Sequence, residues 1–403
     1  MSPTNPIIVI VALTVCLLVT KLISSLFKIE LKPVKYNSID GLRGYLAFFV
    51  FLHHSAVYYF FLTTWKWDVP PSNLFTHFGQ TSVVLFFMVT GFLFFSKLID
   101  MRNKKMDWLH FFVSRVFRLY PLYLIVLFIM ICIVYIMSGY TRLESNHSLI
   151  SEIKQWLLFT VYGNPDVNDY KETSGIMASV IWSIKYEWIF YFSLPLIGFL
   201  FFKQWHSFLI IVVSILVAIS MFNYINNIHF YSFIGGIAGA ILARSNRFLK
   251  FSNHFLSSII IIVCLFCSVY FFKTAYRPVP LILTSVAFVL ISGGNSIFGV
   301  LNLNVSRQVG QLSYSIYLWH TTLLFILYRM IIGFETANKY SPEKFWTITC
   351  LGLVSSLLII SFITYYFVEL PFINAASKVT AKIRNVKNRI LKCFTRILRF
   401  EKL

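Results

Sequence analysis

The chain has 403 residues, of which 58% are hydrophobic and only 12% are charged, and its mean hydropathy is +0.75. A soluble domain of this length carries roughly a quarter charged residues, so this composition excludes an ordinary soluble protein and indicates a polytopic membrane protein. The formal charge of +20 would suit a nucleic-acid partner, but the basic residues are distributed as expected for membrane orientation, and we expect no nucleic acid to bind.

Apolar runs of about 20 residues, each long enough to cross ~30 Å of hydrocarbon, recur along the whole sequence. They predict an all-α transmembrane bundle with about eleven spans. The first is expected to be an anchor, because no basic segment precedes it as in a signal peptide. The predicted spans are 7–27, 44–64, 79–99, 119–138, 179–202, 207–224, 229–243, 255–273, 279–298, 311–331 and 345–367.

The distribution of basic residues predicts the orientation of these spans. If the first span runs from outside to inside, most of the 35 lysines and arginines fall in cytoplasmic segments or at cytoplasmic span ends. This positive-inside bias places the N-terminus outside and the C-terminus inside. We divide the chain into an anchor and linker (1–37), a membrane domain (38–372) and a basic tail (373–403). The apolar residues of the tail recur at helical spacing, which predicts an amphipathic helix on the anionic inner leaflet.

The second span carries polar residues that are costly inside a membrane and therefore indicate a site. Arg43 and His54 are eleven residues apart, about three helical turns, so both side chains lie on nearly one face, ~16 Å apart. A guanidinium at the inner surface suits phosphate groups, and a neutral imidazole deeper in the membrane can take a proton from a hydroxyl. We therefore expect Arg43 and His54 to line one passage. The alternative is an interfacial arginine and a histidine bound by a neighbouring helix.

Six segments, in order and in register, resemble the motifs of acyltransferase family 3 over about residues 38–372. In the first, an arginine, ten residues and the family's catalytic histidine follow one another, and in the second Thr90 replaces the usual serine. The segments are "DGLRGYLAFFVFLHHS" (40–55), "GQTSVVLFFMVTGFLF" (79–94), "FFVSRVFRLYPLYL" (111–124), "IWSIKYEWIFYFSLPLI" (181–197), "GQLSYSIYLWHTTLL" (310–324) and "FVELP" (367–371).

The resemblance implies an integral-membrane O-acyltransferase of the bacterial inner membrane, with His54 as the catalytic general base. Such enzymes take an acyl group, usually acetyl, from cytoplasmic acyl-CoA. They transfer it to a hydroxyl of a surface polysaccharide or its lipid-linked precursor, such as O-antigen, capsule or exopolysaccharide. The expected partners are thus acyl-CoA as co-substrate, a glycan acceptor and the lipid bilayer, with no permanently bound cofactor and no metal. Direct transfer and an acyl-histidine intermediate both remain open.

Arg115 and Arg118 lie three residues apart at the cytoplasmic end of the fourth span, so a helix points both side chains to one region. With Arg43 they are our candidates for binding the phosphates of coenzyme A. The alternative is that they only set the membrane topology, which is the role expected for the loop residue Lys104 and its basic neighbours.

Ser179, Ser183, Glu187 and Tyr191 recur every four residues in the fifth span and form one polar stripe. Glu187 is expected to orient His54 or to bind the acceptor, with a helix-packing hydrogen bond as the alternative. Further candidates for contact with the oxyanion or the acceptor are Thr90, Ser183, Tyr191 and His320. For His320 a packed histidine is the alternative, and Glu369 is either a helix stop or a partner for Arg43.

A transporter or flippase is the rival class of protein, because a many-span bundle with intramembrane charges also suits secondary transport. Against it, the sequence has no broken helices in two symmetric halves, and the polar residues concentrate near one basic cytoplasmic mouth. Cys264 and Cys267 lie in an apolar span without acidic or histidine neighbours, so they do not predict a metal site.

Overall fold

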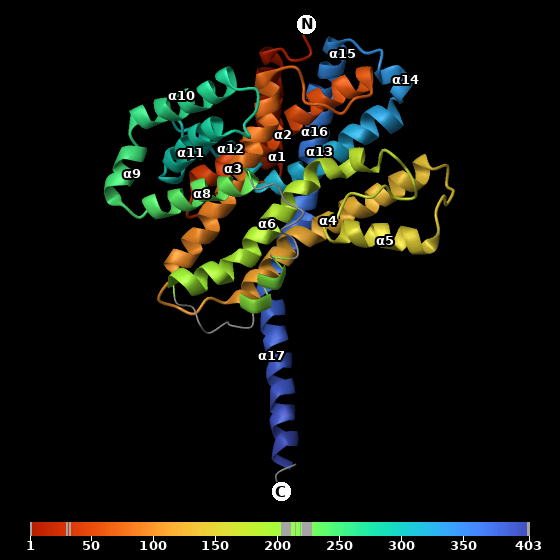
Figure 1. Cartoon of the computed structure of the whole chain (residues 1–403). Coiled ribbons are helices and arrows are strands. Elements are labelled where there is room, and N and C mark those ends of the chain that lie inside the picture. The colour runs from red at the N-terminus through yellow and green to blue at the C-terminus, as the bar shows by residue number, and fades with distance from the viewer. Residues whose placement is uncertain are drawn as a thin grey trace.

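The computed structural model describes residues 2–29, 31, 34–202, 211–213, 215–217, 219 and 228–400, without the side chains of 178–179 and 391–400. In the described part the chain is helical throughout, apart from loops and one isolated bridge between Val167 and Tyr170. The predicted all-α bundle is therefore confirmed (Figure 1).

The helices follow one another in chain order. The first half comprises α1 (Pro6–Leu26), α2 (Asn37–Thr64), α3 (Asn73–Asp100), α4 (Trp108–Met137), α5 (Asn146–Leu157), α6 (Thr173–Phe202) and α8 (Ile228–Leu242). The second half comprises α9 (Asn246–Ser252), α10 (Phe255–Phe271), α11 (Pro278–Ser292), η2 (Val300–Asn302), α12 (Asn304–Gln311), α13 (Ser313–Phe325), η3 (Ile326–Ile331), α14 (Phe334–Ala337), α15 (Pro342–Thr347), η4 (Ile348–Leu353), α16 (Val354–Thr364), η5 (Tyr365–Glu369) and α17 (Leu370–Phe400).

Six of the described helices are long and apolar enough to cross a membrane, and the bent pair α9–α10 adds a seventh if it forms one span. α8 and α11 are shorter apolar helices at two further predicted spans. The tenth predicted span contains α13 and the π-helical η3, and the sixth, 207–224, lies largely outside the described residues. The multi-pass character is established, whereas the number of spans and their orientation stay predictions.

Glycines set the close packing of the helices that carry the candidate residues. A Cβ at Gly310 would lie 1.9 Å from the backbone oxygen of Asp40, so α12 packs directly against the start of α2. A Cβ at Gly236 would lie 2.1 Å from the Met88 oxygen, so α8 packs as closely against α3. Small residues allow such backbone contacts between membrane helices. Here one contact holds α2, which carries Arg43, and the other holds α3, which carries Thr90.

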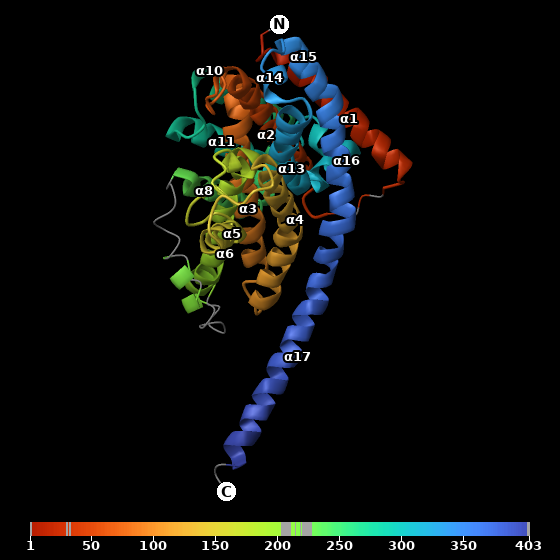
Figure 2. The ribbon, with the colours of Figure 1, turned by 90° about the vertical axis from the view of Figure 1, so that its right-hand side faces the viewer.

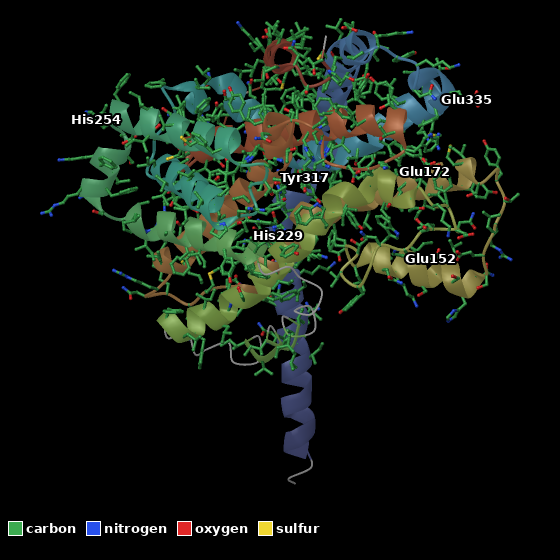
Figure 3. All side chains as sticks on the ribbon, turned by 45° about the horizontal axis from the view of Figure 1, so that its top comes forward. Glu152, Glu172, His229, His254, Tyr317 and Glu335 are labelled. Carbon is green, nitrogen blue, oxygen red and sulfur yellow. The ribbon has the colours of Figure 1, made fainter. Side chains whose placement is uncertain are left out.

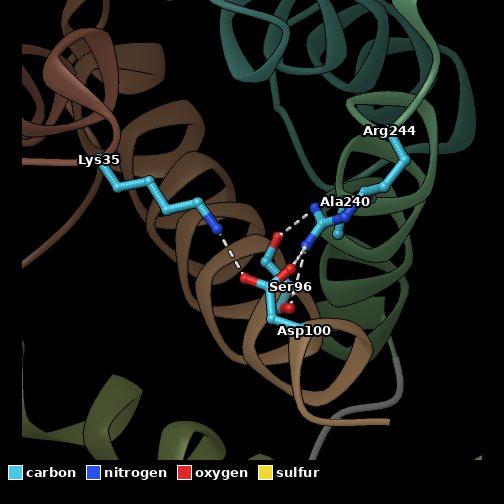
Figure 4. Close-up of polar contacts among 5 residues, drawn as sticks. All are labelled: Lys35, Ser96, Asp100, Ala240 and Arg244. Atoms are coloured by element: carbon cyan, nitrogen blue, oxygen red, sulfur yellow. Dashed lines mark hydrogen bonds and ion pairs between the residues drawn. The ribbon is translucent and has the colours of Figure 1, made fainter. Parts of the chain in front are cut away.

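A polar cluster joins the ends of α3 and α8 to the segment before α2 (Figure 4). The Arg244 guanidinium donates to Oγ and the carbonyl of Ser96 (both 3.0 Å), to the carbonyl of Ala240 (2.8 Å) and to Oδ1 of Asp100 (2.8 Å). The Lys35 ammonium donates to the other Asp100 oxygen at 2.6 Å. One carboxylate thus binds two cations from two different segments.

The C-terminal helix α17 continues from α16 through η5 and projects away from the bundle (Figures 1 and 2). The Arg384 guanidinium pairs with Asp107, which also caps α4, and the His110 and Thr380 side chains are hydrogen-bonded at 3.3 Å. The predicted amphipathic helix is present, with Ile383, Val386 and Ile390 exposed in the described part of its apolar stripe. The tail does not bend away from the preceding helices, because one helix runs unbroken from Pro342 to Ile390.

Candidate active site

A cavity of about 340 Å³, here called the arginine cavity, lies between α2, α3, α4, α6 and α13. It gathers residues that are far apart in the sequence and that belong to five of the six quoted motifs. The candidate residues that line it are Arg43, Thr90, Arg115, Arg118, Ser183, Glu187 and Tyr191.

Three guanidinium groups face this cavity, and two of them make loose ion pairs. Nη1 of Arg43 lies 3.7 Å from Oδ1 of Asp40, and Nη2 of Arg118 lies 4.0 Å from Oε2 of Glu369. The Arg115 guanidinium lies 5.0 Å from the centre of the Phe94 ring, and its buried Nε has no hydrogen-bond partner within the part of the chain that the structure describes. These ion pairs are longer than hydrogen bonds, which leaves N–H groups available to an anionic ligand.

Glu369 does not pair with Arg43, in contrast to one of the two roles expected for it. It accepts a hydrogen bond from the Ser315 hydroxyl and faces Arg118. Arg43 pairs instead with Asp40, because the two residues are three apart on the same helix.

The polar stripe of α6 lines the cavity at Ser183, Glu187 and Tyr191, while the Ser179 side chain lies outside the described part. The Tyr191 hydroxyl donates to Oε2 of Glu187 at 2.7 Å. Glu187 therefore makes a local hydrogen bond among the arginines, which is the alternative expected for it, and the hydrogen-bond partner of His54 in this structure is another residue. A carboxylate is held more favourably beside guanidinium groups than beside a neutral imidazole.

The partner of His54 is His320. Nδ1 of His54 lies 2.9 Å from Nε2 of His320, and Nδ1 of His320 lies 3.1 Å from the carbonyl oxygen of Ile316. A carbonyl only accepts hydrogen bonds, so a neutral His320 carries its proton on Nδ1 and presents the lone pair of Nε2. That lone pair accepts the Nδ1 proton of His54. The remaining nitrogen of His54, Nε2, is then unprotonated, which is the form a general base needs.

His53, the other histidine of the first motif, lies edge-on to His54, with the ring centres 5.0 Å apart, but it has a different hydrogen-bond partner. Its Nδ1 lies 2.8 Å from the carbonyl oxygen of Phe75. A Cβ at Gly79 would lie 2.5 Å from the His53 ring, so the glycine makes room for it. His53 therefore serves as a matched neighbour with which to test His54.

His54 and His320 are buried and do not line the arginine cavity, so the expected open passage from Arg43 to His54 is not continuous in this structure. Tyr317 lines the cavity and also packs against one member of the histidine pair, with its ring centre 6.0 Å from that of His320. Its hydroxyl donates to the Val180 carbonyl at 2.9 Å, and it lies inside the bundle beside α6 (Figure 3). The Tyr317 side chain therefore lies between the arginine cavity and the histidine pair.

Sequence reasoning did not single out Tyr317. The signal was present, because Tyr317 precedes His320 by three residues in the "SYSIYLWH" segment and a helix places residues so spaced on one face. For possible metal ligands, no group of three or more His, Cys, Asp or Glu side chains is arranged to hold a metal ion in the described ranges.

The bundle and this cavity define a polytopic membrane protein with a cationic binding site beside a histidine pair. A family model described as an acyltransferase domain matches residues 36–365. The chain therefore belongs to acyltransferase family 3, as its motifs predicted, and is a membrane acyltransferase. Neither a curated protein nor a solved structure matches it.

Proposed function

We propose that this protein is an O-acyltransferase that moves an acetyl group from cytoplasmic acetyl-CoA to a hydroxyl of a bacterial surface polysaccharide or its lipid-linked precursor. The observation that carries the proposal is the convergence of Arg43, Arg115 and Arg118 on one cavity that borders the His54–His320 pair through Tyr317. Family membership supports acyl transfer in general, and the cavity supports the choice of donor.

The donor binds through its phosphates. Coenzyme A carries a diphosphate and a 3′-phosphate, and guanidinium groups bind phosphate oxygens bidentately through charge-assisted hydrogen bonds. Three of the four charged residues that line the arginine cavity are arginines, and the fourth is Glu187. With the predicted orientation, Arg43 lies at the cytoplasmic end of α2, so the thioester end of a bound acyl-CoA points toward His54.

His54 acts as the general base. Its Nε2 takes the proton of the acceptor hydroxyl while the hydroxyl oxygen forms a bond to the thioester carbonyl carbon. The carbon–sulfur bond then breaks, and the proton passes from His54 to the leaving CoA thiolate, so that the ester and the free thiol are the only products. Thr90 and Ser183, which line the cavity, are the candidates for stabilising the negative oxygen of the intermediate.

The exclusion of water from a buried base supports this chemistry in a second way. His54 and His320 expose 8% and 0% of their surface. A thioester held beside a buried base is protected from hydrolysis, and two bound substrates react with the advantage of proximity.

The test compares His54→Ala with His53→Ala in membranes supplied with radiolabelled acetyl-CoA. We expect transfer of label to glycan to fall at least 10²-fold in His54→Ala and to persist in His53→Ala. Thermal unfolding in detergent verifies that both variants are folded. Undiminished transfer by folded His54→Ala contradicts the proposed base. Substrate flux without any covalent label would instead identify a transporter.

A further inference from the structure

A second cavity of about 510 Å³, here called the aromatic cavity, is lined by other residues of three helices that also line the arginine cavity, α2, α6 and α13. On α2, Arg43 lines the arginine cavity and Tyr58 lines the aromatic one. On α13, Tyr317 and Phe325 line the two cavities in the same order. The histidine pair belongs to these same two helices and lies between the two sets of lining residues.

Tyr58, which lines this cavity, has a hydroxyl that makes no hydrogen bond in the described part of the chain. The residue is 1% exposed. A buried hydroxyl without a partner is costly, so this group is suited to a ligand. Tyr58 follows His54 by four residues on α2, about 6 Å along the helix axis, and a ligand bound to it therefore lies close to the base.

Aromatic faces form much of the remaining wall. Trp67 and Trp182 line the cavity, and the Trp67 ring centre lies 6.0 Å from that of Tyr58. Amphipathic rings of this kind combine a large apolar face with polar edges. Such a wall suits a ligand that is itself apolar on its ring faces and rich in hydroxyls at its edge.

The charged groups of the cavity are already compensated. The Glu172 carboxylate accepts two hydrogen bonds from the Arg329 guanidinium, one of them at 3.0 Å from Nε. The Lys171 ammonium lies 2.5 Å from Oδ1 of Asp169. Because each charge has an opposite partner, the cavity favours an uncharged ligand over an anionic one. Figure 3 shows Glu172 where α6 begins, apart from Tyr317 in the interior.

We propose that the aromatic cavity binds an uncharged saccharide ring, with Tyr58 hydrogen-bonded to it and the tryptophans packed on its faces. The inference rests on the proposed function, because it identifies the acceptor as a neutral sugar and places it at the end of the bundle opposite to acyl-CoA. Two substrates of different chemistry then approach His54 from two cavities. In the predicted orientation the aromatic cavity is the outer one.

Gly175 offers a clean way to block the aromatic cavity. It lines the cavity near the start of α6, and a Cβ added there would meet no atom within 4 Å. Gly175→Trp therefore fills the cavity without displacing backbone. Gly352, in η4, is equally open and does not line either cavity, so Gly352→Trp is the matched control.

The experiment measures saturation-transfer NMR signals of neutral methyl glycosides and of a methyl uronate with the purified full-length protein, alongside CoA binding by calorimetry. We expect ring-proton signals from neutral glycosides that exceed those from the uronate. We expect about tenfold weaker binding in Tyr58→Phe and loss of the signals in Gly175→Trp but not in Gly352→Trp, with CoA binding retained in all four proteins.

The outcomes separate this inference from the proposed function. Absence of glycoside signals from protein that binds CoA overturns the inference, as do signals that survive Gly175→Trp or that favour the uronate. Glycoside binding that depends on Gly175, in a protein that neither binds CoA nor transfers acyl groups, overturns the proposed function and leaves the saccharide site established.

Discussion

The Nδ1 of His54 and the Nε2 of His320 lie 2.9 Å apart although 266 residues separate them in the sequence. The Ile316 carbonyl at the far side of His320 determines which nitrogen of each ring carries the proton. The arrangement resembles that of a catalytic triad, in which a third group holds the base in the correct tautomer. Here the third group is a neutral imidazole, so it orients the base without adding a negative charge.

The first prediction concerns the orienting role of His320. His320→Phe removes the acceptor for the Nδ1 proton of His54, and we expect kcat to fall about 10²- to 10³-fold with little change in the KM for acyl-CoA. His320→Gln keeps an acceptor oxygen at the end of the side chain, and its loss of kcat is expected to be smaller. Steady-state kinetics of folded proteins checks this. Equal losses in the two variants would mean that His320 only packs the core.

The second prediction concerns the donor phosphates. Arg115→Gln and Arg118→Gln each remove a guanidinium from the arginine cavity, and we expect each to raise the KM for acyl-CoA about tenfold, because a charge-assisted hydrogen bond to phosphate is lost. Lys104→Gln removes an exposed loop charge and is expected to leave KM unchanged. Calorimetric titration with CoA should give the same ranking. A KM that rises equally in all three variants would indicate non-specific electrostatics.

Much of the site was predictable from the sequence because membrane helices leave a strong signal. Arg43, Thr90, Arg115 and Glu187 come from four separate motifs and all line the arginine cavity. The continuous passage from Arg43 to His54 that helical arithmetic predicted is absent from this structure. Hydropathy placed the second span at 44–64, whereas α2 begins at Asn37.

The rest depends on tertiary contacts that no local pattern encodes. The sequence pointed to Glu187, and not to His320, as the group that orients His54, because only the packing of α13 against α2 brings His320 to His54. The unpaired hydroxyl of Tyr58 is likewise invisible in a sequence, since an unmet hydrogen bond is a property of its surroundings.

The third prediction concerns the Asp100 cluster of Figure 4. Asp100→Asn removes the charge that binds both Lys35 and Arg244. The hydrogen bond that Lys35 donates to Asp100 is the largest cause of the raised pKa of Lys35. The Lys35 and Asp100 side chains are 63% and 44% exposed, so solvent screening limits the loss to about 1 kcal/mol. Thermal unfolding in detergent should show a lower Tm for Asp100→Asn, and the difference should shrink in 1 M salt. A Tm deficit that is independent of salt would point to packing rather than charge.

The fourth prediction concerns the buried carboxyl of Glu152 in α5, the helix between α4 and α6. Ser148 donates to its Oε1 at 2.8 Å and the Asn168 amide to its Oε2 at 3.1 Å. Burial, together with the neighbouring Glu144 carboxyl, raises the pKa of Glu152 above its ordinary value of 4.5. A carboxyl whose pKa is higher in the folded state stabilises the fold fully below pH 4.5 and loses that contribution as the pH rises through the folded-state pKa.

Glu152→Gln cannot lose this proton, so its Tm should match that of the unchanged protein at pH 4 and exceed it increasingly toward neutral pH. Glu335→Gln alters an exposed carboxyl at another site and provides the control, with a Tm difference expected to stay constant across the same range; Figure 3 shows both positions. Thermal unfolding of the three proteins in one detergent, from pH 4 to pH 8, measures these differences. A Tm difference for Glu152→Gln that stays flat would mean that Glu152 is ionised throughout, with its charge compensated by the Ser148 and Asn168 donors.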